Sequence, residues 1–141
     1  MRIMLDLNVL LDYAQKREPF YTHSKIVISE VLKKNAIGFL PGHAVTTLYY
    51  LVSKHIDKQK ADAFTDWLLQ NFEIAATEKP AFIRARTLVM PDFEDAVVAS
   101  LAQDENCDFI ISRNISDFTN SPVPALMPEA FVRQFVRIDC E

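Results

Sequence analysis

The chain opens with a short apolar run, Met1-Arg-Ile-Met-Leu, that turns polar at Asp6-Leu-Asn8. A run of this kind without polar alternation is typical of a buried strand in a parallel sheet, because helices cover both faces of such a strand. A second run, Phe109-Ile-Ile-Ser112, ends in the same way. Functional groups of open α/β sheets gather just beyond the carboxyl ends of the strands. The two runs therefore predict an α/β fold with a polar site at one edge of its sheet.

Short strands alternate with helical patterns along the rest of the chain. Strands are predicted at 2–6, 36–40, 72–76, 109–112 and 123–127, and helices at 9–16, 22–35, 45–56, 58–71, 80–91, 92–106 and 128–136. Thr22, Asp57 and Asp92 are predicted N-caps, and Pro80 suits a first helical position. Strands separated by helices imply a central parallel sheet of four to five strands flanked by helices on both faces. We expect strands 2–6 and 109–112 to be adjacent and central.

Composition narrows the class of protein. With 141 residues, half of them apolar, the chain is predicted to form one domain over residues 1–141. A net charge of −4 argues against a protein that coats nucleic acid through bulk positive charge. It is compatible with a nuclease that has a local basic rim, for which the candidates are Lys33, Lys34, Lys54, Lys58 and Lys60.

The location of the protein is predicted from what the sequence lacks. Two distant cysteines, Cys107 and Cys140, are too few for a disulfide framework and are interpreted as a buried thiol and a tail residue. A strand begins at once after Met1, so no signal peptide is expected. No apolar run is long enough to span a membrane. A cytoplasmic protein with no membrane partner is expected.

Three acids fall at predicted strand or helix mouths: Asp6, Asp95 and Asp117. Carboxylates brought within about 5 Å of one another would repel by roughly 3 kcal/mol per pair at an effective dielectric near 20. Such a group needs a protonated member, a basic partner or a divalent cation. Oxygen ligands with open water positions suit Mg²⁺ or Mn²⁺, and such an ion can activate water for attack on a phosphodiester.

Each of these acids also has a structural alternative. Asp6 could cap the following helix through Asn8 or Val9, and Asn8 could either cap that helix or orient Asp6. Asp92 and Asp95 stand at the N-cap and N3 positions of a predicted helix, as in a capping box. Asp12 is interpreted as a residue of the helix surface or as a partner of the ligating acids.

Other chemistries find little support. The chain holds only two glycines, so it has no glycine-rich phosphate loop, and it has no Gly-x-Ser-x-Gly elbow. No lysine follows the last predicted strand, as a phosphoacceptor receiver would require. An α/β phosphatase-like enzyme would want a second carboxylate two residues after Asp6, where Asn8 stands.

Three motifs together resemble the PIN-domain family: Leu5-Asp-Leu-Asn-Val-Leu-Leu-Asp12, Phe93-Glu-Asp-Ala96 and Ile111-Ser-Arg-Asn-Ile-Ser-Asp-Phe118. Their order and spacing agree over nearly the whole chain. The resemblance implies a Mg²⁺- or Mn²⁺-dependent ribonuclease, often the toxin of a toxin–antitoxin pair, with RNA as substrate, an antitoxin as partner and a homodimeric state. It implies that Asp6, Asp95 and Asp117 hold the metal and that Asn8 and Asn114 support them. Arg113 is a candidate phosphate contact.

One position departs from the family pattern. Where the family usually has an acid on its third helix, this chain has Thr47, or Thr46 if the alignment shifts. A hydroxyl can hydrogen-bond a metal-bound water but supplies no charge, and Glu94 or Asp92 could compensate. The alternative function is therefore a catalytically weakened PIN-like domain that binds RNA or a protein.

The third and fourth predicted helices carry a wide apolar surface. Their apolar residues exceed what one small sheet face is expected to bury, which favours dimerisation through these helices. The residues concerned are Tyr49, Tyr50, Phe64, Trp67, Leu68 and Phe72.

Overall fold

A computed structural model describes residues 1–137 and shows a five-stranded parallel sheet in the order β3-β2-β1-β4-β5. The strands are β1 (Arg2–Leu5), β2 (Ile37–Pro41), β3 (Glu73–Ala75), β4 (Phe109–Ile111) and β5 (Ala125–Leu126). β1 lies in the middle and pairs with β2 on one side and β4 on the other. The predicted parallel sheet, and the central adjacent pair within it, are confirmed.

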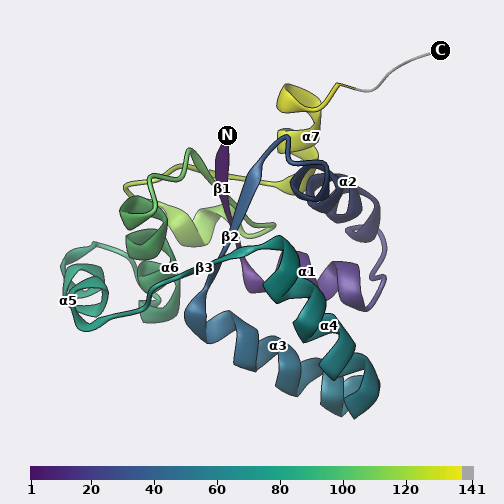
Figure 1. Cartoon of the computed structure of the whole chain (residues 1–141). Coiled ribbons are helices and arrows are strands. Elements are labelled where there is room, and N and C mark those ends of the chain that lie inside the picture. Colours follow the sequence, from purple (N-terminus) through teal and green to yellow (C-terminus); the bar gives the residue numbers. More distant parts are fainter. Residues whose placement is uncertain (138–141) are drawn as a thin grey trace.

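Helices cover both faces of this sheet (Figure 1). They are α1 (Leu7–Ala14), α2 (Tyr21–Leu32), α3 (Gly42–His55), α4 (Lys58–Asn71), α5 (Lys79–Thr87), α6 (Phe93–Asp104) and α7 (Pro128–Phe135), with a 3₁₀ turn η1 (Ile115–Phe118). One hydrophobic cluster joins the sheet to α1, α2, α3, α4 and α7, and a second joins it to α5 and α6. This three-layer arrangement is the α/β fold that the sequence predicts.

The strand ends align at one edge of the sheet. Leu5 of β1 is in register with Ile111 of β4, and Ile111 with Leu126 of β5. The ladder continues one residue further, since the Asp6 N–H donates to the Ile111 carbonyl over 2.9 Å and the Ser112 N–H to the Leu126 carbonyl over 3.0 Å. Asp6 and Ser112 therefore leave neighbouring strands side by side.

Three predicted boundaries were wrong for local reasons. α1 begins at Leu7, two residues early, because Asp6 itself is the N-cap. Thr22 does not cap α2, since a preceding turn already satisfies the helix start: the Tyr21 N–H donates to the Arg17 carbonyl and the Ser24 N–H to the Phe20 carbonyl. α5 ends at Thr87 rather than near Pro91, where Leu88 turns to extended backbone.

The apolar stripe of α3 and α4 belongs to the core. Leu68 is fully buried, Phe72 is 5% exposed, and Phe64 and Trp67 pack against the same cluster. A Cβ on Gly38 would lie 2.8 Å from the Phe72 ring, so a glycine on β2 makes room for that ring. Leu68 and Phe72 are therefore not left over for a dimer, whereas Tyr50 of the same predicted surface is 59% exposed, and dimerisation through these helices stays a prediction.

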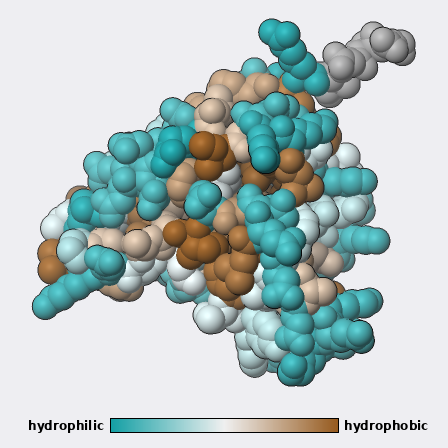
Figure 2. Space-filling model, viewed as in Figure 1, coloured by the Kyte–Doolittle hydropathy of each residue, from teal (hydrophilic) through white to brown (hydrophobic). Residues whose placement is uncertain are grey.

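Exposed apolar side chains gather elsewhere. In Figure 2 they form a patch near the centre of the visible face, over the sheet edge where β2 and β3 run, and the exposed apolar residues of these two strands are Ile37 and Ile74. Cys107 forms no disulfide, and its burial raises the pKa of its thiol to about 12. Cys140 lies outside the described residues. No helix within residues 1–137 is long and apolar enough to cross a bilayer.

Candidate active site

Asp6 lies where β1 passes into α1. Its Oδ1 accepts a 2.8 Å hydrogen bond from the Leu7 N–H, and its Oδ2 accepts one of 2.8 Å from the Ser112 hydroxyl. Burial raises the pKa of the Asp6 carboxyl, the two hydrogen bonds oppose that rise, and the charges of Glu94 and Asp117 add to it. Asp6 is thus both a helix cap, through Leu7 rather than Asn8 or Val9, and a member of an acidic group.

Asp95 approaches this group from the first turn of α6. Its N–H donates to Asp92 Oδ1 over 2.9 Å, so Asp92 is the N-cap of α6, as predicted. Burial raises the pKa of the Asp95 carboxyl to about 7, and the charges of Asp92, Asp6, Asp117 and Glu94 contribute in that order. The fold therefore brings Asp6, Asp95 and Asp117 within one another's electrostatic field, together with Glu94.

Asp117 and Asn114 lie on the turn that follows β4. The Asp117 N–H donates to the Asn114 carbonyl over 3.1 Å, and the Asn114 N–H donates to the Ser112 Oγ over 3.1 Å. Both residues are exposed at the edge of the sheet. Their side chains are thus available to a ligand, and the metal role of Asp117 and the supporting role of Asn114 stay predictions.

Ser112 is the residue of this site that the sequence analysis did not single out. Its hydroxyl donates to Asp6 and accepts from the Asn114 N–H, and the side chain is fully buried. It links β1, β4 and the turn carrying Asp117. A polar residue closing the apolar run Phe109–Ser112 was the available signal, but it was counted as part of the strand.

Asn8 lies in the first turn of α1 and is half-buried. Its Oδ1 is buried without a hydrogen-bond partner, and among the described residues no hydrogen bond joins it to Asp6. A buried amide oxygen normally accepts a hydrogen bond, so Asn8 Oδ1 is free to accept one from a ligand. The support that Asn8 gives to the acids therefore stays a prediction.

Asp12 is not a surface residue, since it is 1% exposed. Its Oδ2 lies 3.0 Å from Arg113 Nε, at ion-pair distance although without hydrogen-bond alignment, and the Arg113 guanidinium lies 4.4 Å from the centroid of the Phe20 ring. Burial raises the pKa of the Asp12 carboxyl and Arg113 opposes that rise. Arg113 thus holds the segment after β4 to α1, which weakens its case as a phosphate contact.

Part of the predicted basic rim was also misplaced. Lys33 and Lys34 follow α2 just before β2 begins, at the amino end of the sheet, whereas the acids gather at the carboxyl end. Lys58 pairs with Asp62 over 3.1 Å.

Thr47 lines a cleft beside the acids. Its hydroxyl donates to the His43 carbonyl, one turn earlier on α3, over 3.0 Å. The cleft has a volume of about 340 Å³ and lies between α3, α5 and α6, lined by His43, Thr47, Phe82, Phe93, Glu94 and Val97. His43 Nε2 lies 3.5 Å from Glu94 Oε1 across it. Glu94, rather than any residue of α3, is the additional acid in the field of Asp6 and Asp95.

The acidic group can be compared with the ligands that a divalent cation prefers. Burial raises the pKa of both Asp6 and Asp95, and the charges of neighbouring carboxylates add to that rise, so a cation would relieve the repulsion. As placed, residues 1–137 contain no group of three or more His, Cys, Asp or Glu side chains close enough to hold one ion together. The donor set fits Mg²⁺ or Mn²⁺ bound through one or two carboxylates, with water as the remaining ligands.

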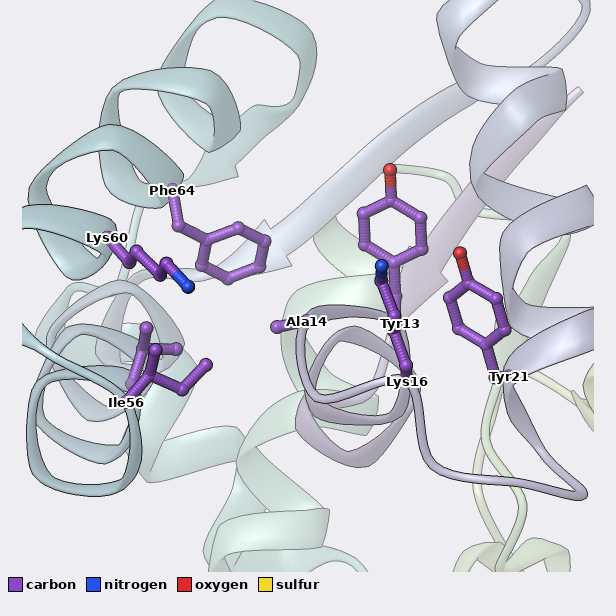
Figure 3. A pocket seen from close by; sticks show the side chains of 8 residues that line it. Tyr13, Ala14, Lys16, Tyr21, Ile56, Lys60 and Phe64 are labelled. Carbon is purple, nitrogen blue, oxygen red and sulfur yellow. The ribbon is translucent and has the colours of Figure 1, made fainter.

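A separate groove lies among α1, α2, α3 and α4 (Figure 3). Its volume is about 260 Å³, and it is lined by Tyr13, Ala14, Lys16, Tyr21, Val52, Ile56, Lys60 and Phe64. The rings of Tyr13 and Tyr21 stack with centroids 6.1 Å apart. Lys16 and Lys60 give this otherwise apolar groove a positive rim. None of the acids of the candidate site lines it.

A central parallel sheet with an acidic group at its carboxyl edge defines the chain as an α/β protein with a candidate site at the strand ends. Comparison with known families makes the class specific, since the model of the PIN domain matches residues 2–116. The chain belongs to the PIN domain family.

Individual relatives agree with this assignment. The chain is 27% identical to ribonuclease VapC1 of Aquifex aeolicus over 139 residues, and this alignment covers 95% of each chain. The crystal structure of VapBC2 from Rickettsia felis, bound to a DNA fragment from its promoter, is similar in fold, with a TM-score of 0.67, 20% identity and coverage of 90% of this chain and 98% of that one. DNA-bound VapBC from Salmonella typhimurium gives a TM-score of 0.66 at 18% identity, with coverage of 91% and 98%.

Proposed function

We propose that this protein is a Mg²⁺- or Mn²⁺-dependent endoribonuclease and the toxin of a toxin–antitoxin pair, acting in the cytoplasm. The observation that carries the proposal is the position of Asp95, whose carboxyl shares one field with Asp6 and Asp117 at the carboxyl edge of the sheet. The relative named a ribonuclease spans almost the whole chain, which supports RNA as the substrate.

Each acid has a defined task in this proposal. Asp6, Asp95 and Asp117 would hold the cation, one or two of them directly and the others through bound water, and the cation when bound would supply the positive charge and the activated water needed for phosphodiester hydrolysis. Ser112 and the Leu7 N–H fix the two oxygens of Asp6. The first turn of α6 fixes Asp95, and the exposed turn η1 presents Asp117 at the mouth of the site.

The test is RNA cleavage by the purified protein with Mn²⁺, with Mg²⁺ and with a chelator. Cleavage is expected with either ion and not with the chelator. Asp95→Asn keeps the shape of the side chain and removes a negative ligand, so it should slow cleavage on the order of a hundredfold or more. Asp66→Asn, an exposed acid of α4, is the matched control and should cleave like the wild type. Unchanged cleavage in Asp95→Asn would defeat the proposal.

A second candidate function is a weakened PIN domain that binds RNA or protein without cutting. The observation that favours it is Thr47, whose hydroxyl is bonded within its own helix and brings no charge to the cleft. Binding of RNA without cleavage under either metal would support this alternative.

We also propose that an antitoxin protein docks in the groove formed by Tyr13, Tyr21, Ile56 and Phe64. The VapBC structures similar in fold to this chain support such a partner. The rim lysines Lys16 and Lys60 favour an apolar segment flanked by acids. The test is co-purification with the product of the neighbouring gene. Lys16→Glu with Lys60→Glu should weaken that complex, and Lys33→Glu, an exposed lysine that does not line the groove, is the control.

The homodimer expected from the family also remains a proposal. Ile83 on α5 and Val89 after it are 57% and 78% exposed, and exposed large apolar side chains favour self-association. Light scattering is expected to give a dimer for the wild type and a monomer for Ile83→Lys. A monodisperse monomer at high concentration would contradict the dimer.

We propose, finally, that residues 1–141 form one domain, although the matched family region ends at residue 116. β5 and α7 follow that region and complete the same sheet and the same core cluster. Residues 138–141 lie outside the described part of the chain. Limited proteolysis should therefore yield no stable fragment that ends near residue 116.

A further inference from the structure

The cleft between α3, α5 and α6 has two unlike sides. Phe82 of α5 and Phe93 of α6 form an aromatic side, with ring centroids 6.4 Å apart and planes tilted by 33°. The two side chains are 39% and 45% exposed, so part of each ring remains open to a ligand. The core does not use these faces, unlike those of Phe64 and Trp67.

The other side of the cleft is polar. Glu94, the residue after Phe93, lies 3.5 Å from the His43 ring, and the Thr47 hydroxyl donates its hydrogen bond to the His43 carbonyl. Glu94 is also one of the charges that act on Asp6 and Asp95. The lining of the cleft therefore includes the residue that precedes Asp95 on α6.

A cation completes the aromatic side. The Arg86 guanidinium lies 6.0 Å from the centroid of the Phe93 ring, on the exposed surface of α5. The neighbouring Arg84 is engaged with Ser100 and Asp104. A guanidinium beside a partly exposed aromatic ring suits a ligand that combines an aromatic base with a negatively charged backbone.

We propose that this cleft binds an unpaired nucleobase of the RNA strand, adjacent to the phosphodiester at the acidic group. The inference rests on the proposed ribonuclease function and deepens it, because it assigns part of the substrate specificity to a defined surface. Single-stranded RNA is recognised by stacking of splayed-out bases on aromatic rings and by hydrogen bonds to the base edges. Phe82 and Phe93 supply the stacking surface.

The polar side selects among bases by their edges. The Glu94 carboxylate accepts hydrogen bonds only, so it favours a base edge that presents N–H groups, and the His43 ring can donate to a base carbonyl. Guanine offers two neighbouring N–H donors and a carbonyl on one edge. A base of that kind is therefore the preferred occupant, and a base paired in a duplex, whose edge is already used, is excluded.

The test measures binding in a chelator, so that cleavage does not interfere. The probe is a short fluorescent single-stranded oligoribonucleotide containing guanine, compared with copies that carry an abasic residue at each position in turn. For the wild type, one abasic position is expected to weaken binding on the order of tenfold, the size of one lost base stack. Phe93→Ala should weaken binding of the intact probe by a similar factor and should lose nothing more at that position.

Matched variants keep the result interpretable. Phe93→Tyr retains a ring and should bind like the wild type, and Leu69→Ala, which changes an exposed apolar residue of α4 outside the cleft, should bind unchanged. Equal sensitivity to abasic positions in the wild type and Phe93→Ala would overturn the proposal. So would an affinity loss in Phe93→Ala that is accompanied by a change from dimer to monomer, since the face would then be a contact between copies.

The binding assay and the RNA cleavage assay can fail independently of each other. Wild-type protein that shows the abasic effect but does not cleave RNA with Mn²⁺ would uphold the base site and defeat the ribonuclease. Protein that cleaves RNA but binds every abasic probe equally would uphold the ribonuclease and defeat the base site.

Discussion

The Ser112 hydroxyl donates a hydrogen bond of 2.8 Å to Asp6 Oδ2, across the ends of the two central strands. The contact is buried on the Ser112 side, and Ser112 also accepts the Asn114 N–H over 3.1 Å. One hydroxyl therefore sets the rotamer of the first acid and the start of the turn that carries Asp117. The order of the acidic group depends on a residue that carries no charge.

Ser112→Ala should impair both activity and stability. A hydrogen bond to a charged group contributes about 1.5–3 kcal/mol, so urea unfolding should show a loss of that order. The hydrogen bond lowers the pKa of Asp6, and its removal should raise that pKa further. The pH–rate profile should then shift to higher pH. Ser112→Thr keeps the hydroxyl and should restore both properties, and a profile unmoved by Ser112→Ala would contradict this role.

Asp95→Asn should stabilise the fold at neutral and alkaline pH. The pKa of Asp95 lies at about 7 in the folded protein against an ordinary 3.8, so the folded state binds a proton that the unfolded chain has already released. Between these values the stability contributed by this group falls as pH rises. Asparagine has no charge to lose. Melting temperatures of variant and wild type should therefore differ more at about pH 8 than at about pH 4.

Added Mg²⁺ supplies the control for that result. It should raise the melting temperature of the wild type at alkaline pH more than that of Asp95→Asn, because the variant has one negative ligand fewer. Equal shifts in both proteins would mean that Asp95 does not contact the ion.

Thr47→Glu should tighten metal binding. Thr47 is half-buried and lines the cleft with Glu94, so a longer side chain has room to extend beside an existing acid. A Mn²⁺ titration should give a higher affinity than in the wild type, and any residual cleavage should increase. Thr47→Gln, which adds the same bulk without charge, is the control. Unchanged affinity in a folded Thr47→Glu protein would mean that the position of the missing acid was misassigned.

The Asp12–Arg113 pair should show unequal single-mutant costs. Removing one partner of a buried ion pair costs on the order of 3 kcal/mol. Asp12 is 1% exposed, whereas the Arg113 side chain is 26% exposed. Arg113→Met should therefore destabilise more than Asp12→Asn, because it leaves the more buried charge without a partner. The double variant should be more stable than Arg113→Met alone, as measured by urea unfolding.

The sequence was most informative where a pattern has a single structural outcome. The apolar runs at 2–6 and 109–112 are short and lack polar alternation, which favours buried parallel strands, and the structure confirms both. Asp57 and Asp92 are N-caps as predicted, because a carboxylate before a helical run has a local partner in the next N–H groups.

Features that depend on tertiary contacts were harder to predict. The burial of Asp12 requires Arg113, about a hundred residues later, to lie against α1, and no local pattern encodes that pairing. The burial of Phe72 depends on the space that Gly38 leaves on β2, and no local pattern in the sequence shows that contact. Ser112 was overlooked because its role exists only when β4 lies beside β1.

The pairing of β1 with β4 has a consequence for the moment at which this protein can act. Leu5 and Ile111 are register partners, and 106 residues separate Asp6 from the serine that fixes it. Contacts between such distant segments form late, since most of the chain must be in place before they close. A nascent chain still being synthesised presents Asp6 early but lacks β4 and η1. The acidic group is therefore assembled only after residues 109–118 have been synthesised, which would keep the proposed ribonuclease from attacking RNA before that point.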